Sequence, residues 1–150
     1  MMRNQIHPSS PSLIDNIFIN TRATRARVLF SIQNLAVLEA KGAFPKRIRL
    51  GPNRIAWPLA DILAWMQDKV DSRPAFPPAN HVIVDANERF IGKPELRKIV
   101  TYTPQHLRFL ELKGQFPPRI RIGENRSAWL QSEVRQWIEE RLQASRNVAS

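Results

Sequence analysis

One stretch of sequence occurs twice in this chain of 150 residues, as GAFPKRIRLGPNRIAW from Gly42 to Trp57 and as GQFPPRIRIGENRSAW from Gly114 to Trp129. The two copies lie 72 residues apart, and this offset continues without a gap on both sides of the stretch. Between residues 28–70 and 100–142, 18 of 43 aligned positions are identical. A unit of this length is too long for a solenoid repeat and long enough for a very small domain. The sequence therefore predicts two tandem copies of one small domain.

Composition limits what can stabilise such a chain. Two units of roughly 50 to 60 residues each have a small hydrophobic core. The chain has no cysteine and three histidines, so disulfides, thiolate metal sites and a zinc-ligand pattern are not expected. Residues 1–16 lack the apolar run of a signal peptide, and no apolar stretch is long enough to span a bilayer. We expect a cytoplasmic, nucleoid-associated protein without cofactor or metal.

The excess of positive charge is concentrated in the two copies. The whole chain has 23 basic and 13 acidic residues. Residues 21–70 have a net charge of +6 and residues 93–150 of +5, whereas residues 71–92 have −1. Two basic units suit a polyanionic partner, because lysine and arginine on phosphates release condensed counterions. A basic surface that is only solvated is the alternative.

Four segments are predicted along the chain: a flexible arm at 1–16, a first module at 17–72, a proline-rich linker at 73–88 and a second module at 89–146. The connector starts with SRPAFPP at residues 72–78, which is fairly stiff, and residues 72–87 would span on the order of 50 Å when extended. This length would allow the modules to reach neighbouring turns of DNA, roughly 34 Å apart. Within the linker, HVIVD at His81–Asp85 is either a short strand that pairs with the second hairpin or extended chain packed on a domain.

Each copy is predicted to contain three helices. In the second copy, Pro94 suits the first turn of a helix, where its missing amide proton costs nothing. Gly42 and Gly114 should end the middle helices. Tryptophans at the same positions in both copies are interpreted as core residues; these are Trp57, Trp65, Trp129 and Trp137. The helices are expected at about residues 21–29, 30–42 and 59–70, and at 93–100, 102–114 and 131–143.

The middle helix of each copy is the candidate reading helix. Ser31 and Thr103 have the properties of N-cap residues, and they could also bind phosphate. If the leucines face the core, amides and an imidazole remain on the opposite face near the amino-terminal end, where a helix in the major groove contacts bases. The candidate DNA-binding residues of these helices are Ser31, Gln33, Asn34 and Val37, and Thr103, Gln105, His106, Arg108 and Phe109.

After the helix, arginines alternate with apolar residues on both sides of a glycine-asparagine turn signal. This pattern predicts a two-stranded hairpin with arginines on one face and apolar residues on the other. Such a hairpin would act as a wing that contacts the DNA backbone or the minor groove. Charges on an edge ribbon also prevent aggregation between strands, which is the alternative role. The candidate residues are Arg47, Arg49, Asn53 and Arg54, and Arg119, Arg121, Asn125 and Arg126.

Each copy resembles the AlpA family of phage and genomic-island regulators, which belongs with the winged-helix MerR and excisionase proteins. The shared pattern is the helix TPQHLRFLELKG followed by G-x-F-P, R-I-R-[LI]-G, N-R-x-A-W and a helix with an acidic residue four positions before tryptophan. The second copy matches it better. In the first copy, the more polar reading positions are replaced by Ile32, Asn34, Ala36 and Val37. The resemblance covers about residues 17–72 and 89–144.

This resemblance implies an α+β, mainly helical fold with two tandem winged-helix modules and no enzymatic activity. Such proteins activate transcription or act as recombination directionality factors that bend DNA for an integrase. Most have one module, so two fused modules are a departure from the family. A MerR-type sensor domain is missing, and we therefore expect no small-molecule ligand.

Two functional hypotheses remain. The first is sequence-specific binding of double-stranded DNA at two adjacent half-sites, with direct repeats favoured over a palindrome and with integrase or RNA polymerase as possible protein partners. The second is an adaptor in which the first module binds a protein and the second binds DNA. An enzyme is not expected because no catalytic constellation occurs, and Glu39 and Glu111 are better explained as helix-surface residues or as structural partners of a nearby arginine. Few aromatic residues are available for RNA base stacking.

Overall fold

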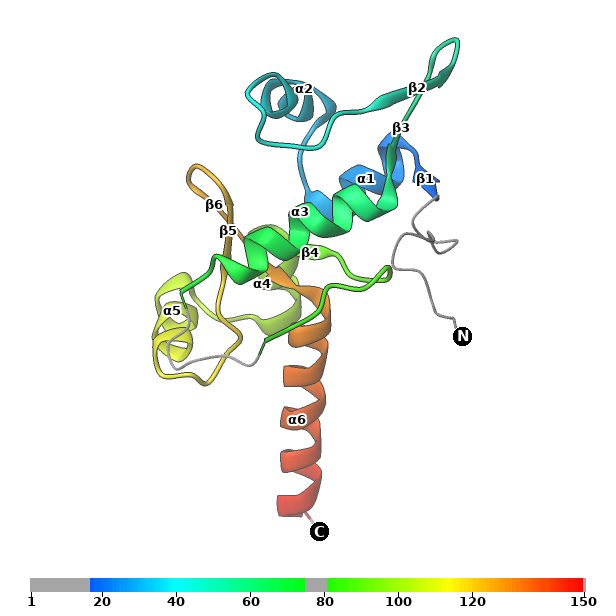
Figure 1. Ribbon diagram of the computed structural model, residues 1–150. Helices are drawn as coiled ribbons and strands as arrows, with labels where there is room; N and C mark the ends of the chain where they lie inside the picture. The colour runs from blue at the N-terminus through cyan, green and yellow to red at the C-terminus, as the bar shows by residue number, and fades with distance from the viewer. Residues whose placement is uncertain (1–16, 75–80, 150) are drawn as a thin grey trace, which may run out of the picture.

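The computed structural model describes residues 17–74 and 81–149 (Figure 1). The predicted arm at 1–16 and the part of the predicted linker at 75–80 lie outside the described residues. Within the described residues, each copy folds into a three-stranded antiparallel sheet and three helices. The fold is therefore α+β and mainly helical, in two similar modules, as the sequence predicted.

The two modules have the same order of elements. The first contains β1 (Phe18–Ile19), α1 (Thr21–Val28), α2 (Ile32–Ala40), β2 (Ile48–Gly51), β3 (Arg54–Pro58) and α3 (Leu59–Asp71). The second contains β4 (Phe90–Gly92), α4 (Lys93–Val100), α5 (Pro104–Leu112), β5 (Ile120–Gly123), β6 (Arg126–Leu130) and α6 (Gln131–Ala149). The strand orders are β1-β3-β2 and β4-β6-β5, so the hairpin strand that precedes the last helix is central in each sheet.

Local sequence explains where the elements begin and end. The Asn20 side chain accepts a hydrogen bond from the backbone amide of Ala23 at 2.8 Å and caps α1. After α2 and α5, Gly42 and Gly114 have φ of +75° and +73°, a left-handed conformation that glycine adopts without strain. The last helix of the second module, α6, extends beyond the predicted end near residue 143. In the first module, Pro74 lies shortly after the end of α3, and proline cannot continue a helix. The corresponding part of α6 contains neither proline nor glycine, so this helix continues.

Each sheet has one face toward the core of its own module. In the second module, Trp129 and Ile91 lie on this inner face and pack on helices α4, α5 and α6. Trp57 occupies the same place in the first module and is fully buried. Trp65 is also buried, but Trp137 is only partly buried, so the prediction of four core tryptophans holds fully for three of them.

The opposite, outer face of the second sheet is buried against the first module. Phe90, Ile120 and Leu130 on this face share one hydrophobic cluster with residues of the first module. Trp65 of α3 contacts Phe90 with ring centroids 6.2 Å apart, and α3 lies between the two sheets (Figure 1). The modules thus pack directly on each other.

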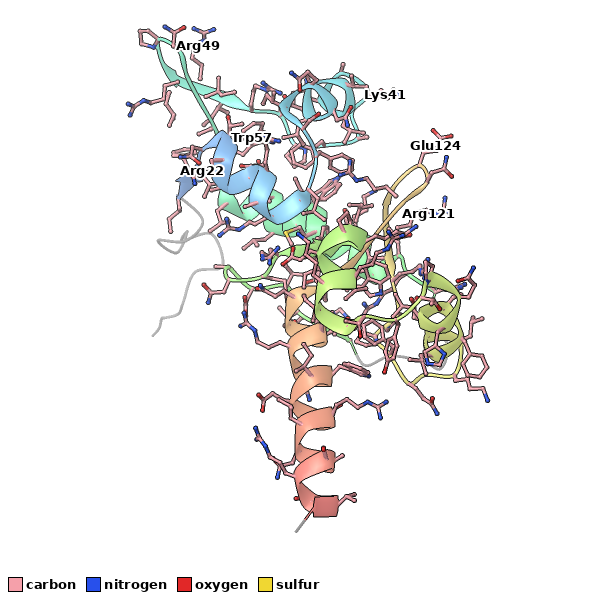
Figure 2. The ribbon with its side chains drawn as sticks, turned by 180° about the vertical axis from the view of Figure 1, so that it is seen from behind. Arg22, Lys41, Arg49, Trp57, Arg121 and Glu124 are labelled. Carbon is pink, nitrogen blue, oxygen red and sulfur yellow. The ribbon has the colours of Figure 1, made fainter. Side chains whose placement is uncertain are left out.

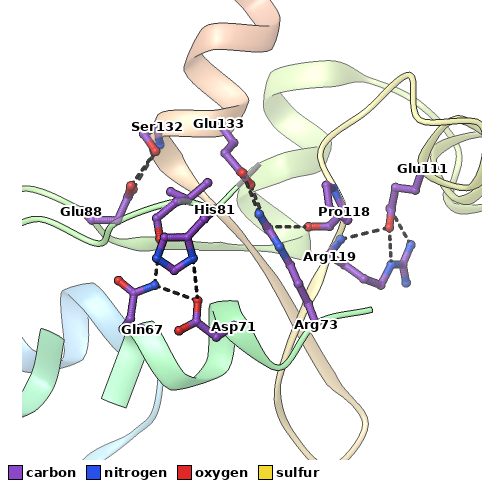
Figure 3. Close-up of polar contacts among 11 residues, drawn as sticks. Gln67, Asp71, Arg73, His81, Glu88, Glu111, Pro118, Arg119, Ser132 and Glu133 are labelled. Atoms are coloured by element: carbon purple, nitrogen blue, oxygen red, sulfur yellow. Dashed lines mark hydrogen bonds and ion pairs between the residues drawn. The ribbon is translucent and has the colours of Figure 1, made fainter. Parts of the chain in front are cut away.

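Polar contacts reinforce this packing. The buried Arg73 guanidinium donates to both carboxylate oxygens of Glu133, at 2.8 and 2.7 Å, and to the carbonyl oxygen of Pro118 at 3.2 Å (Figure 3). His81–Asp85 forms no strand. It runs as extended chain beside α3, where Gln67 bonds the backbone of Val82 and Val84 at 2.8 Å each, in agreement with the second of the two predicted arrangements.

The matched isoleucines Ile120 and Ile48 test whether the module interface stabilises the fold. Ile120 is buried by the first module, whereas Ile48 is exposed at the same position of the first sheet. We expect Ile120→Ala to lower the free energy of unfolding by about 2–5 kcal/mol. Ile48→Ala should lower it by about 1 kcal/mol or less. Urea unfolding of dilute protein measures both, and equal losses would contradict the shared core.

A second prediction concerns the start of α4. Arg89 donates to the Glu95 carboxylate, and this hydrogen bond lowers the pKa of Glu95 from its ordinary value of 4.5 while partial burial opposes the shift. A carboxylate with a lowered folded-state pKa stabilises the fold above pH 4.5 and loses that contribution as the pH falls through the folded-state pKa. The stability difference between the wild type and Glu95→Gln should therefore be largest near neutral pH. Urea unfolding across pH measures it, and a difference that grows on acidification would contradict this assignment.

Candidate nucleic-acid interface

The amino-terminal ends of α2 and α5 are built alike. Ser31 Oγ accepts a hydrogen bond from the Asn34 amide at 3.1 Å, and Thr103 Oγ1 accepts one from the His106 amide at 3.1 Å. Both N-cap predictions are confirmed. Each cap leaves further amide protons of the first turn pointing outward, and such amides bind phosphate well.

The predicted reading residues are exposed in both helices. Leu35 and Leu107 are buried, so the helices turn their polar side outward. Arginine and amide side chains at these positions could bond base edges in a major groove. The exposed residues are Gln33, Asn34 and Val37 in α2, and Gln105, His106, Arg108 and Phe109 in α5.

The exposed face of α5 has more contacts among its own side chains than the exposed face of α2. His106 packs against Tyr102 at 4.9 Å between ring centroids and stacks on Phe109 at 6.1 Å. Lys113 Nζ lies 4.9 Å from the Phe109 ring centroid. Asn34 replaces His106 in α2, and no aromatic row can form there. Tyr102 and Lys113, which contact these residues, were not among the predicted site residues; the available signal was the identity of Lys113 with Lys41 in the first copy.

Two predicted hairpin arginines are held inside the modules. Arg119 donates to Glu111 through Nε at 2.8 Å and Nη2 at 2.9 Å, and its backbone amide donates to the same carboxylate at 3.2 Å. Arg47 binds Glu39 in the same way, with Nε at 3.0 Å and Nη2 at 2.9 Å from the carboxylate oxygens. The prediction that Glu39 and Glu111 are structural partners of an arginine is confirmed. Each of these arginines joins the middle helix to the start of the hairpin, and Figure 3 shows the contact in the second module.

The other hairpin arginines differ between the modules. Arg49 lies far out on the first hairpin, and Arg121 lies on the second hairpin near the first module (Figure 2). Both side chains, and that of Arg54, are exposed. Arg126 is exposed as well, but it lies 4.9 Å from the Phe30 ring centroid and donates to the carbonyl oxygen of Leu29 at 2.6 Å. The second hairpin therefore contacts the first module, whereas the first hairpin extends into solvent.

The hairpin turns depend on asparagine at the same position in both copies. Asn53 and Asn125 have φ of 55° and 56°, a left-handed conformation that asparagine tolerates better than most residues. The predicted turns are confirmed, and these two asparagines have a conformational role at the hairpin tips.

Reading helices and hairpins follow one another along one edge of the molecule. In Figure 1, α2, the tip of the β5–β6 hairpin and α5 succeed each other along the left edge, and in the reverse view of Figure 2 they occupy the right edge. The first hairpin extends from the far end of this series. A basic edge of this form is typical of a protein that follows a nucleic-acid backbone.

A capped helix with exposed polar residues, joined to a hairpin that carries arginines and present twice, is an arrangement typical of small DNA-binding regulators. The family model described as "Prophage CP4-57 regulatory protein (AlpA)" matches residues 31–70 and 106–142, one match in each module and together just over half of the chain. The chain belongs to this AlpA family, a family of phage-type DNA-binding regulators.

One curated relative is similar to part of this chain. The uncharacterized protein ORF88 of Enterobacteria phage P4 is 36% identical over 55 residues. The match spans 37% of this chain and 62% of the relative, less than two thirds of its length. No solved structure matches the chain significantly.

Residues 17–74 and 81–149 contain no group of three or more acidic, histidine or cysteine side chains placed to hold a metal ion. Among the same residues, every helix is too short or too polar to cross a membrane.

The Glu111–Arg119 contact generates a prediction about stability. Glu111 is buried, and its carboxylate accepts bonds from both the backbone and the side chain of Arg119. Glu111→Gln removes the charge that these bonds require, and we expect a loss of about 2–3 kcal/mol in the free energy of unfolding. Glu140→Gln, at an exposed position of α6, is the control and should leave stability unchanged. Equal urea midpoints for the two variants would show that the contact does not stabilise the fold.

Proposed function

We propose that this protein binds double-stranded DNA sequence-specifically through two winged-helix modules, residues 17–72 and 89–146, joined by a linker at 73–88. It would act in the cytoplasm, at the nucleoid, as a transcriptional regulator or excisionase of a phage or mobile element. The main observation is the pair of capped reading helices, α2 and α5, whose polar residues face solvent along one edge. Membership of a phage regulator family supports the same function.

In this proposal the two reading helices enter the major groove. Gln33 and Gln105 could each form two hydrogen bonds with adenine, while His106 and Arg108 contact base edges or phosphates. The N-cap residues and the exposed hairpin arginines would bind the backbone, which fixes register without reading sequence. Arg47 and Arg119 would contribute indirectly, by holding each hairpin against its helix.

The module interface limits the DNA sites that can be bound. Since α3 and the second sheet share one hydrophobic cluster, the spacing between α2 and α5 is set by packing. The two modules follow each other in the same chain direction, and we therefore favour two adjacent half-sites arranged as direct repeats. Packed modules also bind together without the entropy cost of ordering a loose tether.

Selection from a genomic library of double-stranded fragments tests DNA binding and its contacts. We expect enrichment of one site with two similar half-sites. The double variant Arg49→Ala/Arg121→Ala should weaken binding to all sites alike and reduce the salt dependence, because two phosphate contacts are lost. Arg146→Ala, an exposed arginine in the last turn of α6, is the control. Lack of enrichment above salt-sensitive background would contradict sequence-specific recognition.

The spacing of the half-sites gives a separate test. Inserting about 5 base pairs between the half-sites turns one of them by half a helical turn. Rigidly packed modules cannot follow this rotation, so the affinity should fall to that of a single half-site. An unchanged affinity, measured by gel shift at fixed salt, would mean that the modules separate on DNA.

Regulation and excision can be distinguished with purified components. An excisionase acts together with an integrase on attachment-site DNA, whereas a transcriptional regulator acts through RNA polymerase. Stimulation of excision by the purified protein would support the excisionase role. No effect on excision, together with altered transcription from the bound locus, would support the regulator role.

The adaptor hypothesis rests on the surface of α2. Val37 and Ala36 are exposed there, and these apolar side chains could contact a protein better than a base. Ile32 is partly buried against the core and has a structural role. If Gln105→Ala abolishes DNA binding while Gln33→Ala leaves it unchanged, the adaptor function is favoured. Comparable losses would favour DNA reading by both modules.

A further inference from the structure

The outer faces of the two sheets are equivalent in sequence but differ in burial. Strand register places Phe18 and Ile48 on the outer face of the first sheet, and their counterparts lie on the outer face of the second. The exposed fractions are 46%, 36% and 49% for Phe18, Ile48 and Leu50, and 0%, 0% and 2% for Phe90, Ile120 and Ile122. The first sheet thus presents an apolar surface that is fully covered in the second.

The first module supplies the cover of the second sheet. Trp65, Val70 and Phe30 belong to the hydrophobic cluster that contains Phe90. At the hairpin tip, a Cβ placed on Gly123 would lie 3.3 Å from the Phe30 ring, so the hairpin and this ring are in close contact. The receiving surface consists of one face of α3 and the turn between α1 and α2.

The second module carries the same receiving surface without an occupant among the described residues. Tyr102, Trp137 and Leu142 occupy the positions of Phe30, Trp65 and Val70. The Tyr102–Trp137 pair has ring centroids 6.1 Å apart at 77°, and the Phe30–Trp65 pair has 6.1 Å at 74°. Leu142 is 43% exposed, whereas Val70 is 4% exposed. We call these three residues the α6 surface.

The cation contact at the hairpin tip also has a counterpart. Arg126 binds the carbonyl oxygen of Leu29, a residue with φ of 70°, and covers the adjacent Phe30 ring. In the second module, Thr101 has φ of 55° and precedes Tyr102, so a carbonyl and an aromatic ring follow the same left-handed residue. Arg54 on the first hairpin is exposed and has the chemistry to bind them.

We propose that the outer face of the first sheet in one copy of this chain docks on the α6 surface of a second copy, and so repeats the contact between its own two modules. Phe18 would meet Trp137, and Arg54 would meet Tyr102. Because the two surfaces differ, the contact is head-to-tail, and each added copy offers a free surface of each kind. The chain therefore forms open-ended assemblies.

This contact between copies is weaker than the contact within the chain. The buried Arg73–Glu133 ion pair has no counterpart, since Ser145 and Asp61 occupy the equivalent positions. The apolar contacts and the Arg54 contact remain. Association is consequently reversible and increases with concentration.

Sedimentation velocity of the full chain without nucleic acid tests the proposal, so its outcome is independent of DNA binding. We expect the weight-average mass to rise above the monomer mass of 17.3 kDa with increasing concentration and to continue past that of a dimer. A mass that remains that of a monomer at all concentrations would overturn the proposal. A mass that stops at a dimer would also overturn it.

Two surface variants identify the contact. Leu50→Glu blocks the sheet surface and Leu142→Glu blocks the α6 surface, and each variant alone should remain monomeric. An equimolar mixture has one intact surface of each kind and should form a one-to-one dimer that grows no further. Ile83→Glu, at an exposed residue outside both surfaces, should associate like the wild type. Self-association of either single variant would contradict head-to-tail docking.

The other candidate occupant is the chain's own residues 1–16. A variant that lacks these residues should show the same dependence of mass on concentration as the full chain. If only the shortened chain associates, residues 1–16 cover the sheet in the same molecule, and the proposal is wrong.

Discussion

The burial of the second sheet's outer face against α3 is the contact on which the arrangement of the whole molecule depends. Phe90 and Ile120 are removed from water by residues of the first module, and the buried Arg73 is satisfied by Glu133 and Pro118 of the second. A domain of this size buries little apolar surface alone. Sharing a cluster enlarges the core of both modules and fixes the positions of α2 and α5 relative to each other.

Within each module, a glutamate that is buried in the second module and partly buried in the first fixes the hairpin to the middle helix. Glu39 and Glu111 bind both the backbone amide and the guanidinium of the arginine that starts the hairpin. A carboxylate that is nearly enclosed requires such partners to offset its desolvation. The arginine also lies over the core tryptophan, 5.2 Å from the ring centroid in the first module and 5.3 Å in the second. Helix, hairpin and core are thereby held in one geometry.

Because of the duplication, similar surfaces of the two modules lie in different surroundings. The sheet of the second module is covered by the module before it, but the first module has no preceding module among the described residues, and its sheet remains exposed. At the other end, α6 carries a receiving surface similar to that of α3. A tandem repeat with a directional contact thus has two unlike ends.

The sequence by itself determined the local and repeated features. Alternation, caps and turn residues predicted the six helices and the two hairpins of the described residues, although α6 is longer than expected, and structural partnership with an arginine was one of the two roles predicted for Glu39 and Glu111. These features depend on neighbours in the chain or on contacts that both copies share. The tertiary structure alone decided that Ile120 is buried while Ile48 is exposed, and that Arg126 binds the first module while Arg54 does not. Equivalent positions of the two copies have similar residues. Their burial and their contacts differ because each module has a different neighbour in space.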